Sequence, residues 1–480
     1  MTKHYFDHPY SKILNDTVLD RQKSSFQIYI AKNEYEGCQL VLKSDRDTEV
    51  SVSVKTADFE YEIFLVRYVS VRKEHMYPDG LEPLCEDTRI SLKKGIRQPV
   101  YICFYADSDV KSGSHKAEVW IMTEEETIKT HIDIYVFSFT LPVTPSCITA
   151  FGLGRQYIEK MHGTDEPYAK YYEFLLSHKV SAYDIPVNIL DDEADKYLSD
   201  MRMTSFRIPC SNDDATIEKY YNKLKKNKVW FSKGFFYPLD EPTCMDHYNK
   251  LYEYKDRLNR LFPNNNVCTP FFINPIDSPD KDSVELLDGV SNIWCPKSYM
   301  WMNEDVYAFE TKPFAEKMLE KKRRGDKVLW YVCWEPGDPY CNLFVDMPGI
   351  MHRILFWQKM LYDVDGLLYW HSNYWEHVDN PWDDMATVKW LSDYVFGDGS
   401  LLYNGKNGPC GSLRLEAVRD GIEDFEYLKI AEEAIGKEAT LKLVNKVTKS
   451  LLHYTRDNDE FSDARKELGF LIEKAAIRKD

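Results

Sequence analysis

Two adjacent carboxylates, Asp240 and Glu241, have the residue types and the position in the sequence that catalysis requires. They follow an apolar run, residues 229–237, that we predict to be a buried strand, and Pro242 is expected to open the next helix. In parallel α/β sheets and barrels, the loop between a strand and its helix lies at the edge where active sites form. The pair is therefore a candidate catalytic site.

A second interpretation of the same pair is structural. The chain holds 78 acidic residues among 480, so on the order of a dozen adjacent acidic pairs arise by chance, most of them on solvated surface. Negative charge is also favoured at the N-terminus of a helix, where it interacts with the helix dipole. Asp240 or Glu241 can therefore serve only to support the following helix, and the sequence pattern leaves both interpretations open.

The elements expected to position the pair lie between residues 146 and about 395, where apolar strands alternate with loops and amphipathic helices. Eight strands in about 250 residues is the size of a closed (β/α)8 barrel of the TIM type. The pair then follows the fourth strand. The predicted strands are 148–153, 180–186, 205–209, 229–237, 267–273, 292–296, 327–334 and 366–370, and the predicted helices include 245–261, 312–322 and 349–361.

The segment before this region has a different pattern, in which short alternating apolar runs are divided by turn residues. That pattern predicts an antiparallel β-sandwich. Its clearest strands are 26–30, 37–42, 99–104, 117–121 and 132–137. Two prolines in residues 140–145 break the pattern and mark a domain boundary.

We therefore expect three parts: an N-terminal β-sandwich over residues 1–143, a catalytic barrel over 146–400, and a C-terminal segment over 401–480 with helices packed on the barrel. The last segment is helical from about residue 423 onward. Its charged residues Arg414, Arg419, Glu423 and Glu426 are expected to form ion pairs that fix it to the barrel.

Aromatic and polar side chains follow the sixth, seventh and eighth predicted strands. On a shared edge of the barrel they would surround the carboxylate pair and contact a ligand. These predicted ligand-binding residues are Tyr299, Trp334, Tyr340, Asn342, Trp370 and Trp375.

Composition limits the partners. A formal net charge of −17 argues against nucleic acid and anionic membranes, while 14% aromatic residues suit the flat faces of sugar rings. The sequence shows no apolar signal segment and no apolar run of about 18 residues, so we expect a cytoplasmic protein, although a trimmed export sequence would leave the same appearance. The 11 cysteines are scattered and predicted to be reduced. Without metal-binding or nucleotide-binding motifs, we expect no metal and no cofactor, and the oligomeric state stays open.

Several motifs together resemble those of glycoside hydrolase family 123 and its uncharacterised relatives, over nearly the whole chain. The most specific block runs from Ser412 through Arg414, Arg419 and Glu423 to Leu428. The others are Gly-Phe-Phe-Tyr-Pro-Leu-Asp-Glu-Pro at 234–242, Asn342 with Asp346 and Pro348, Arg353 with Trp357, Asp-Gly-Leu-Leu-Tyr-Trp at 365–370, and Asn-Glu-Tyr-Glu-Gly-Cys-Gln at 33–39.

This resemblance implies an exo-acting, retaining enzyme for terminal β-linked N-acetylgalactosamine, or N-acetylhexosamine, on an oligosaccharide or glycoconjugate; the preference for N-acetylgalactosamine over N-acetylglucosamine rests on the resemblance alone. Because the sequence shows no export signal, imported oligosaccharides are the more natural substrates. In such enzymes the 2-acetamido oxygen of the substrate attacks the anomeric carbon, in place of an enzyme nucleophile. Carried onto this chain, Asp240 would orient the acetamido N–H and stabilise the oxazolinium ion, and Glu241 would be the general acid and then the base. Tyr299 or Tyr340 is the candidate to orient the acetamido group.

The chemistry of a carboxyl pair is compatible with these roles. A general acid must hold its proton near neutral pH, so burial and a neighbouring anion must raise its pKa. Asp240 supplies that anion for Glu241, and the two are expected to titrate as a coupled pair. Trp334 or Trp370 would form the apolar floor under the sugar ring.

Two other functions stay open. One is a glycosidase for a sugar without the acetamido group, in which another carboxylate, such as Glu335, is the nucleophile. The other is a catalytically silent carbohydrate-binding protein on the same scaffold. The presence of both Asp240 and Glu241 counts against the silent protein, which could lose either without losing its fold.

Overall fold

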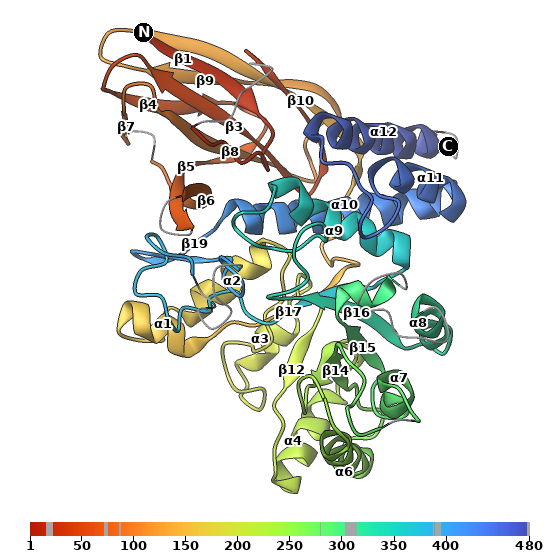
Figure 1. Cartoon of the computed structure of the whole chain (residues 1–480). Helices are drawn as coiled ribbons and strands as arrows, with labels where there is room; N and C mark the ends of the chain where they lie inside the picture. The colour runs from red at the N-terminus through yellow and green to blue at the C-terminus, as the bar shows by residue number, and fades with distance from the viewer. Residues whose placement is uncertain are drawn as a thin grey trace. The chain divides into compact units, whose positions relative to one another are not determined.

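The computed structural model describes residues 1–15, 23–71, 75–85, 88–278, 280–302, 314–386, 388 and 395–477. Within it the chain divides into two compact units (Figure 1). The first unit consists of Met1–Val143, Cys341–Gln358 and Asn373–Asp480, and the second of Thr144–Tyr340 and Lys359–Ser372.

The first unit contains two five-stranded sheets that share one hydrophobic core, as the alternating apolar pattern predicts. One sheet has the order β1 (Thr2–Asp7), β3 (Glu34–Ser44), β8 (Arg97–Ala106), β5 (Glu60–Val71), β6 (His75–Pro83), and every neighbouring pair is antiparallel. The other has the order β2 (Phe26–Lys32), β10 (Thr127–Thr140), β9 (Gly113–Met122), β4 (Thr48–Lys55), β7 (Ile90–Leu92). In this second sheet β2 runs parallel to β10, and the remaining pairs are antiparallel.

The C-terminal part of the first unit is helical. A short hairpin of β18 (Tyr403–Gly405) and β19 (Gly408–Cys410) precedes α10 (Leu413–Ile435), α11 (Lys437–Val447) and α12 (Asn458–Ile477). The Ser412 hydroxyl caps α10 by accepting a hydrogen bond from the backbone N–H of Leu415. Helix α12 packs against α10 and β10 (Figure 1).

Helix α10 is buried along most of its length, including its charged residues from Arg414 to Glu426. Buried charges need ionic partners, and Arg414 finds one in Asp79 on β6, with Nε and Nη2 2.9 and 2.8 Å from its carboxylate oxygens. The sequence predicted ion pairs to the barrel. The observed partner of Arg414 instead lies on a strand of the sandwich.

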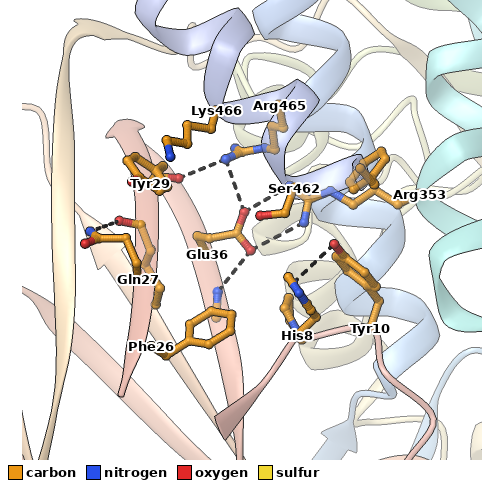
Figure 2. Close-up of a pocket in the computed structure, with 14 residues that line it drawn as sticks. His8, Tyr10, Phe26, Gln27, Tyr29, Glu36, Arg353, Ser462, Arg465 and Lys466 are labelled. Atoms are coloured by element: carbon orange, nitrogen blue, oxygen red, sulfur yellow. Dashed lines mark hydrogen bonds and ion pairs between the residues drawn. The ribbon is translucent and has the colours of Figure 1, made fainter. Parts of the chain in front are cut away.

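A second buried charge cluster links β3 to α9 (Gly349–Tyr362), α10 and α12 within the first unit. Figure 2 shows Glu36 between Arg353 and Arg465, at 2.9 and 3.4 Å. Both arginines also pair with Asp424 on α10, at 2.7 and 2.6 Å. The cavity beside them measures about 30 Å³, which is room for water but not for a sugar ring.

The second unit is built on parallel strands. Its main sheet has the order β11 (Ile148–Phe151), β17 (Gly366–Tyr369), β16 (Lys327–Val332), β15 (Ile293–Pro296), β14 (Cys268–Phe271), and β12 (Phe206–Ile208) pairs with β13 (Gly234–Phe236). The connecting helices are α1 (Arg155–His162), α2 (Tyr168–Ser177), α3 (Ala194–Leu198), α4 (Asp214–Leu224), α5 (Lys228–Lys233), α6 (Met245–Leu261), α7 (Ser283–Leu287), the 3-10 helix η1 (Ser298–Trp301) and α8 (Phe314–Arg323). Helix α9 begins in the first unit and ends in the second.

A closed (β/α)8 barrel is not confirmed. The five-stranded sheet and the β12–β13 pair are separate sheets. One bridge joins Phe236 of β13 to Val267, just before β14, and another joins Phe151 of β11 to Ala182. The predicted strand 180–186 supplies only that one bridge. Residues of β11, β13 and β14 to β17 nevertheless share one apolar core, and Tyr237 and Trp370 of the candidate site pack against it.

The prediction of a strand over residues 229–237 is wrong in its first half. Helix α5 occupies Lys228–Lys233, and β13 covers only Gly234–Phe236. The side chain of Asn227 accepts hydrogen bonds from the N–H groups of Val229 and Trp230, which caps the helix, and Val229 is 55% exposed. A local cap therefore outweighs the apolar pattern.

The prediction that Pro242 opens the following helix is also wrong, because α6 begins at Met245. The helix covers Met245–Leu261, the range expected from its amphipathic pattern. Asp240 and Glu241 therefore lie in a loop between β13 and α6.

In the parts of the chain that the structure describes, no helix is both long and apolar enough to cross a membrane.

Candidate active site

The loop between β13 and α6 holds the two candidate carboxylates in different surroundings. Glu241 has a φ of +44°, in the left-handed region that non-glycine residues seldom occupy and that is enriched at functional sites. The neighbours Asp240 and Glu241 each accept a hydrogen bond from a different tyrosine. They are therefore two separately supported groups.

Asp240 accepts a hydrogen bond from the hydroxyl of Tyr237 at 2.6 Å. The carboxylate is exposed at the wall of a cavity, yet desolvation by the surrounding protein raises its pKa above the ordinary value. The hydrogen bond from Tyr237 and the charge of Lys297 act in the opposite direction on this pKa.

Glu241 accepts a hydrogen bond from the hydroxyl of Tyr331, which is buried on β16. Burial raises the pKa of Glu241, and the anions Asp240 and Glu335 raise it further, while Tyr331 and Lys297 lower it. Glu241 therefore has two neighbouring anions that favour retention of its proton.

Lys297 follows β15 and lies between two carboxylates. Its Nζ is 2.8 Å from Oε1 of Glu335 and 4.0 Å from Oε1 of Glu241, and its side chain is 0% exposed. Such burial requires a nearby anion. The ammonium also lies near four aromatic ring centroids, those of Phe272 at 4.6 Å, Trp334 at 4.8 Å, Tyr331 at 5.4 Å and Tyr299 at 5.8 Å.

The cavity beside Asp240 measures about 520 Å³ and lies within the second unit. That volume falls in the range of small-molecule sites, about 300–1,000 Å³. Asp184 and Arg207 line it and form a bidentate ion pair, with Nε and Nη2 of Arg207 3.1 and 2.6 Å from the Asp184 oxygens. Tyr183 also lines the cavity, and its buried hydroxyl has no hydrogen-bond partner among the described residues. The wall thus offers charged, hydroxyl and aromatic groups to a polar ligand.

The structure brings some of the predicted ligand-binding residues to this site. Trp370 lines the cavity together with Asp240. Trp334 is 40% exposed and contacts Lys297 through its ring. Tyr299 is buried, and its hydroxyl donates to Glu335 at 3.3 Å, so its observed contact is with a carboxylate of the site.

The other predicted ligand-binding residues have different surroundings. Tyr340 is buried in the second unit, and within the described residues its hydroxyl has no hydrogen-bond partner. Asn342 and Trp375 belong to the first unit and are fully buried. The Asn342 side chain accepts from the N–H of Leu343, and the Trp375 indole donates to Ser400. These contacts stabilise the fold, and ligand binding by the three residues stays a prediction.

Sequence reasoning missed several groups of the site, namely Tyr183, Asp184, Arg207, Tyr237 and Tyr331. Tyr331 left a signal, because it alternates with Leu329 and Cys333 on the core-facing side of β16. A hydroxyl on an otherwise apolar face needs a partner. In the described part of the chain, no group of three or more His, Cys, Asp or Glu side chains is arranged to hold a metal ion.

Comparison with known proteins gives the class of the protein. Residues 273–431 match the family model described as glycoside hydrolase 123, catalytic domain. The matched range contains Lys297, Tyr331 and Glu335 and begins after Asp240 and Glu241. A search of curated proteins finds no match.

Solved structures give the fold. A family 123 glycoside hydrolase from Clostridium perfringens, studied for glycolipid glycan hydrolysis, is similar over 99% of this chain and 98% of its own, with a TM-score of 0.70 and 12% identity. The β-glucuronidase 3 of Bacteroides uniformis is aligned over 82% of this chain and 50% of its own at 10% identity, but its TM-score of 0.28 is too low to indicate a common fold.

The match over residues 273–431 indicates a catalytic domain of the glycoside hydrolase class in this part of the chain. More particularly, the matched domain is that of glycoside hydrolase family 123, and the fold shared with a family 123 enzyme agrees with it, so both findings support the resemblance seen in the motifs.

Proposed function

We propose that this glycoside hydrolase removes terminal β-linked N-acetylgalactosamine, or a related N-acetylhexosamine, from a glycan with retention of configuration. The observation that carries the proposal is the pair itself: Asp240 faces the cavity, and the adjacent Glu241 lies beside further anions. One carboxylate kept ionised and one kept protonated is the arrangement that acid-assisted glycoside cleavage needs.

In the first step, the acetamido oxygen of the substrate attacks the anomeric carbon while the glycosidic C–O bond breaks. Glu241 gives its proton to the departing oxygen, and a cyclic oxazolinium ion forms. Asp240 accepts a hydrogen bond from the acetamido N–H and stabilises the positive charge. In the second step, Glu241 takes a proton from water, the water oxygen attacks the anomeric carbon, and the acetamido group is restored.

The surroundings of the two carboxylates favour this division of roles. Desolvation raises the pKa of both groups, but the anions Asp240 and Glu335 raise the pKa of Glu241 further. A hydrogen bond from a tyrosine and the charge of Lys297 lower the pKa of both carboxylates, so the neighbouring anions are what distinguish Glu241 from Asp240. Glu241 is therefore the better acid, and Asp240 the better anion.

The cavity supports a single sugar residue as the bound group. The Asp184–Arg207 pair presents acceptors and donors in a fixed geometry, which suits neighbouring hydroxyl groups. Trp370 supplies an aromatic face in the same cavity. The proposed preference for the galacto configuration rests on the resemblance to glycoside hydrolase family 123, and the Clostridium perfringens enzyme, studied for glycolipid glycan hydrolysis, supports a glycoconjugate as the substrate.

The test is the release of nitrophenol from matched aryl β-glycosides of N-acetylgalactosamine, N-acetylglucosamine, galactose and glucose. We expect cleavage of the acetamido sugars only, with inhibition by a thiazoline analogue of the oxazolinium ion. Cleavage of the plain hexosides would instead indicate an enzyme nucleophile such as Glu335. Absence of cleavage, together with binding in a glycan screen, would indicate a silent binding protein.

Variants of the pair separate its two roles. Glu241→Gln should nearly abolish turnover of substrates with poor leaving groups and spare the fold. Asp240→Asn should slow even activated aryl glycosides, because the oxazolinium ion loses its stabilising anion. Asp192→Asn, in an exposed acidic pair of the same unit, is the matched control and should be fully active. Equal activity of Glu241→Gln on all substrates would remove the acid assignment.

A further inference from the structure

The position of Lys297 indicates a role beyond a single ion pair. One buried ammonium lies between two carboxylates, at hydrogen-bond distance from Glu335 (2.8 Å) and farther from Glu241 (4.0 Å). A general acid–base must carry a proton in the first step of the reaction and lose it for the second. A cation that can move between two anions meets both requirements.

We propose that Lys297 and Glu335 are positioning residues that keep Glu241 protonated for glycosidic bond cleavage and stabilise it as an anion afterwards. This inference rests on the proposed role of Glu241 as general acid and base. While Glu241 is neutral, the ammonium pairs with Glu335. When Glu241 has given up its proton, the ammonium shifts toward it. The only proton that moves is the one that Glu241 exchanges.

The anchoring of Glu335 supports this role. Its Oε1 accepts from both Lys297 and the hydroxyl of Tyr299, at 2.8 and 3.3 Å, and its side chain is 14% exposed. Glu335 therefore has two donors that hold it in place. The surrounding aromatic rings attract the Lys297 ammonium through cation–π contacts and offer it no further anion.

The charges around Glu241 come from three segments. Asp240 lies on the same loop, Lys297 follows β15, and Tyr331 and Glu335 lie on and after β16. After burial, which raises the pKa of Glu241, Tyr331 and Lys297 lower this pKa, and Asp240 and Glu335 raise it. Removal of Glu335 therefore takes away an anion and also frees the ammonium to pair with Glu241. Both effects lower the pKa of Glu241.

The test is a titration of Glu241 by infrared spectroscopy of the intact protein. The band of its protonated carboxyl is assigned by its loss in Glu241→Gln. In Glu335→Gln we expect the titration to move down by about 1 pH unit or more, because an opposite charge now pairs with Glu241 directly. The double variant Lys297→Met/Glu335→Gln removes both charges, so its titration should return to within about half a pH unit of the wild type.

A purely structural Lys297–Glu335 pair predicts a different result, because a second disruptive substitution would not restore the titration. An unshifted or raised midpoint in Glu335→Gln, or no return in the double variant, would overturn the proposal. Lys321→Met is the matched control, since Lys321 Nζ lies 3.1 Å from Asp288 and 4.8 Å from the Trp294 ring. It should leave the midpoint unchanged.

Kinetics give a second readout. Glu335→Gln should retain hydrolysis of aryl glycosides with good leaving groups and lose at least tenfold with poor ones at neutral pH, because only the latter need the proton. The titration does not depend on turnover. If the protein cleaves no glycoside but the Glu241 midpoint shifts as expected, the proposed function is wrong and the role of Lys297 and Glu335 in the titration of Glu241 stands. If the enzyme is active but the midpoint does not shift, only that role of Lys297 and Glu335 is wrong.

Discussion

The hydroxyl of Tyr237 donates a hydrogen bond to Oδ1 of Asp240 at 2.6 Å. Tyr331 does the same for Glu241 from a strand 90 positions farther along the chain. Each carboxylate thus has its own phenol donor, and each donor favours the ionised form of its partner. With the roles proposed for Asp240 and Glu241, we expect the two tyrosines to act on opposite limbs of the pH–rate profile.

Tyr237→Phe should move the acidic limb of kcat/KM to higher pH. The hydrogen bond lowers the pKa of Asp240, so its loss raises that pKa, and the working anion is neutralised earlier as pH falls. A hydrogen bond to a charged group is worth about 1.5–3 kcal/mol, and partial exposure of Asp240 reduces the expected shift to about 1 pH unit. An unmoved acidic limb would show that Asp240 is not the anion the profile reports.

Tyr331→Phe should move the alkaline limb to higher pH instead. Tyr331 lowers the pKa of Glu241, so without it the acid keeps its proton longer as pH rises, by about 1 pH unit. The second chemical step, which needs the anion, should slow. Measurement of kcat and kcat/KM from pH 4 to 9 in steps of about half a unit checks this, and a shift of the acidic limb alone would contradict the assignment.

Trp370→Ala should raise KM about tenfold and leave kcat nearly unchanged, because stacking on the sugar ring is the same in the bound substrate and the transition state. Trp370→Phe is the matched variant, since it keeps an aromatic face and should lose less. Steady-state kinetics on the aryl glycoside distinguish them. If Trp370→Ala lowered kcat with KM unchanged, Trp370 would have to act on the transition state.

Arg353→Met should destabilise the protein by about 3–5 kcal/mol, because it leaves Glu36 and Asp424 buried without one of their cations. Lys446→Met is the control. Lys446 pairs with Glu467 at 2.6 Å in the same unit, but the two side chains are 53% and 45% exposed, so the loss should stay below about 1 kcal/mol. Urea unfolding of the two variants provides the comparison, and equal midpoints would contradict the cluster's role.

The destabilisation by Arg353→Met should shrink in acid. Burial alone would raise the pKa of Asp424, but the guanidinium groups of Arg353 and Arg465 hold it below the ordinary value. The stability that this pairing adds is therefore present above the ordinary carboxyl pKa, about 4, and is lost as pH falls through the lower folded value. Unfolding at pH 3 and pH 7 should show the smaller difference at pH 3.

Periodic segments of the sequence predicted their structure well. The amphipathic range 245–261 is the helix α6, and the alternating runs of the N-terminal segment are strands. The error at 229–237 has a local cause. The side chain of Asn227 caps helix α5, which takes up the first half of the apolar run, and only three residues remain for β13. Closure of the barrel was inferred from strand number, whereas the segment around Ala182 makes only one bridge.

The carboxylate pair could be predicted as a candidate because its chemistry and its loop are both local features of the sequence. The side chains that surround the pair could not be predicted. Tyr331, Lys297 and Glu335 come from other strands, and their approach depends on how the strands pair and which side chains turn inward. Sequence spacing shows that such groups exist near strand ends but not which of them meet.

Arg465 on α12 pairs with Glu36 on β3, as Figure 2 shows, and also with Glu34 on the same strand, so the cluster joins residues far apart in the sequence. On the ribosome, both glutamates emerge long before that arginine is translated. The buried cluster of the first unit is therefore incomplete until α12 has been translated. A copy of the protein cut before α12 lacks this guanidinium, so Glu34 and Glu36 would be buried with one cation fewer.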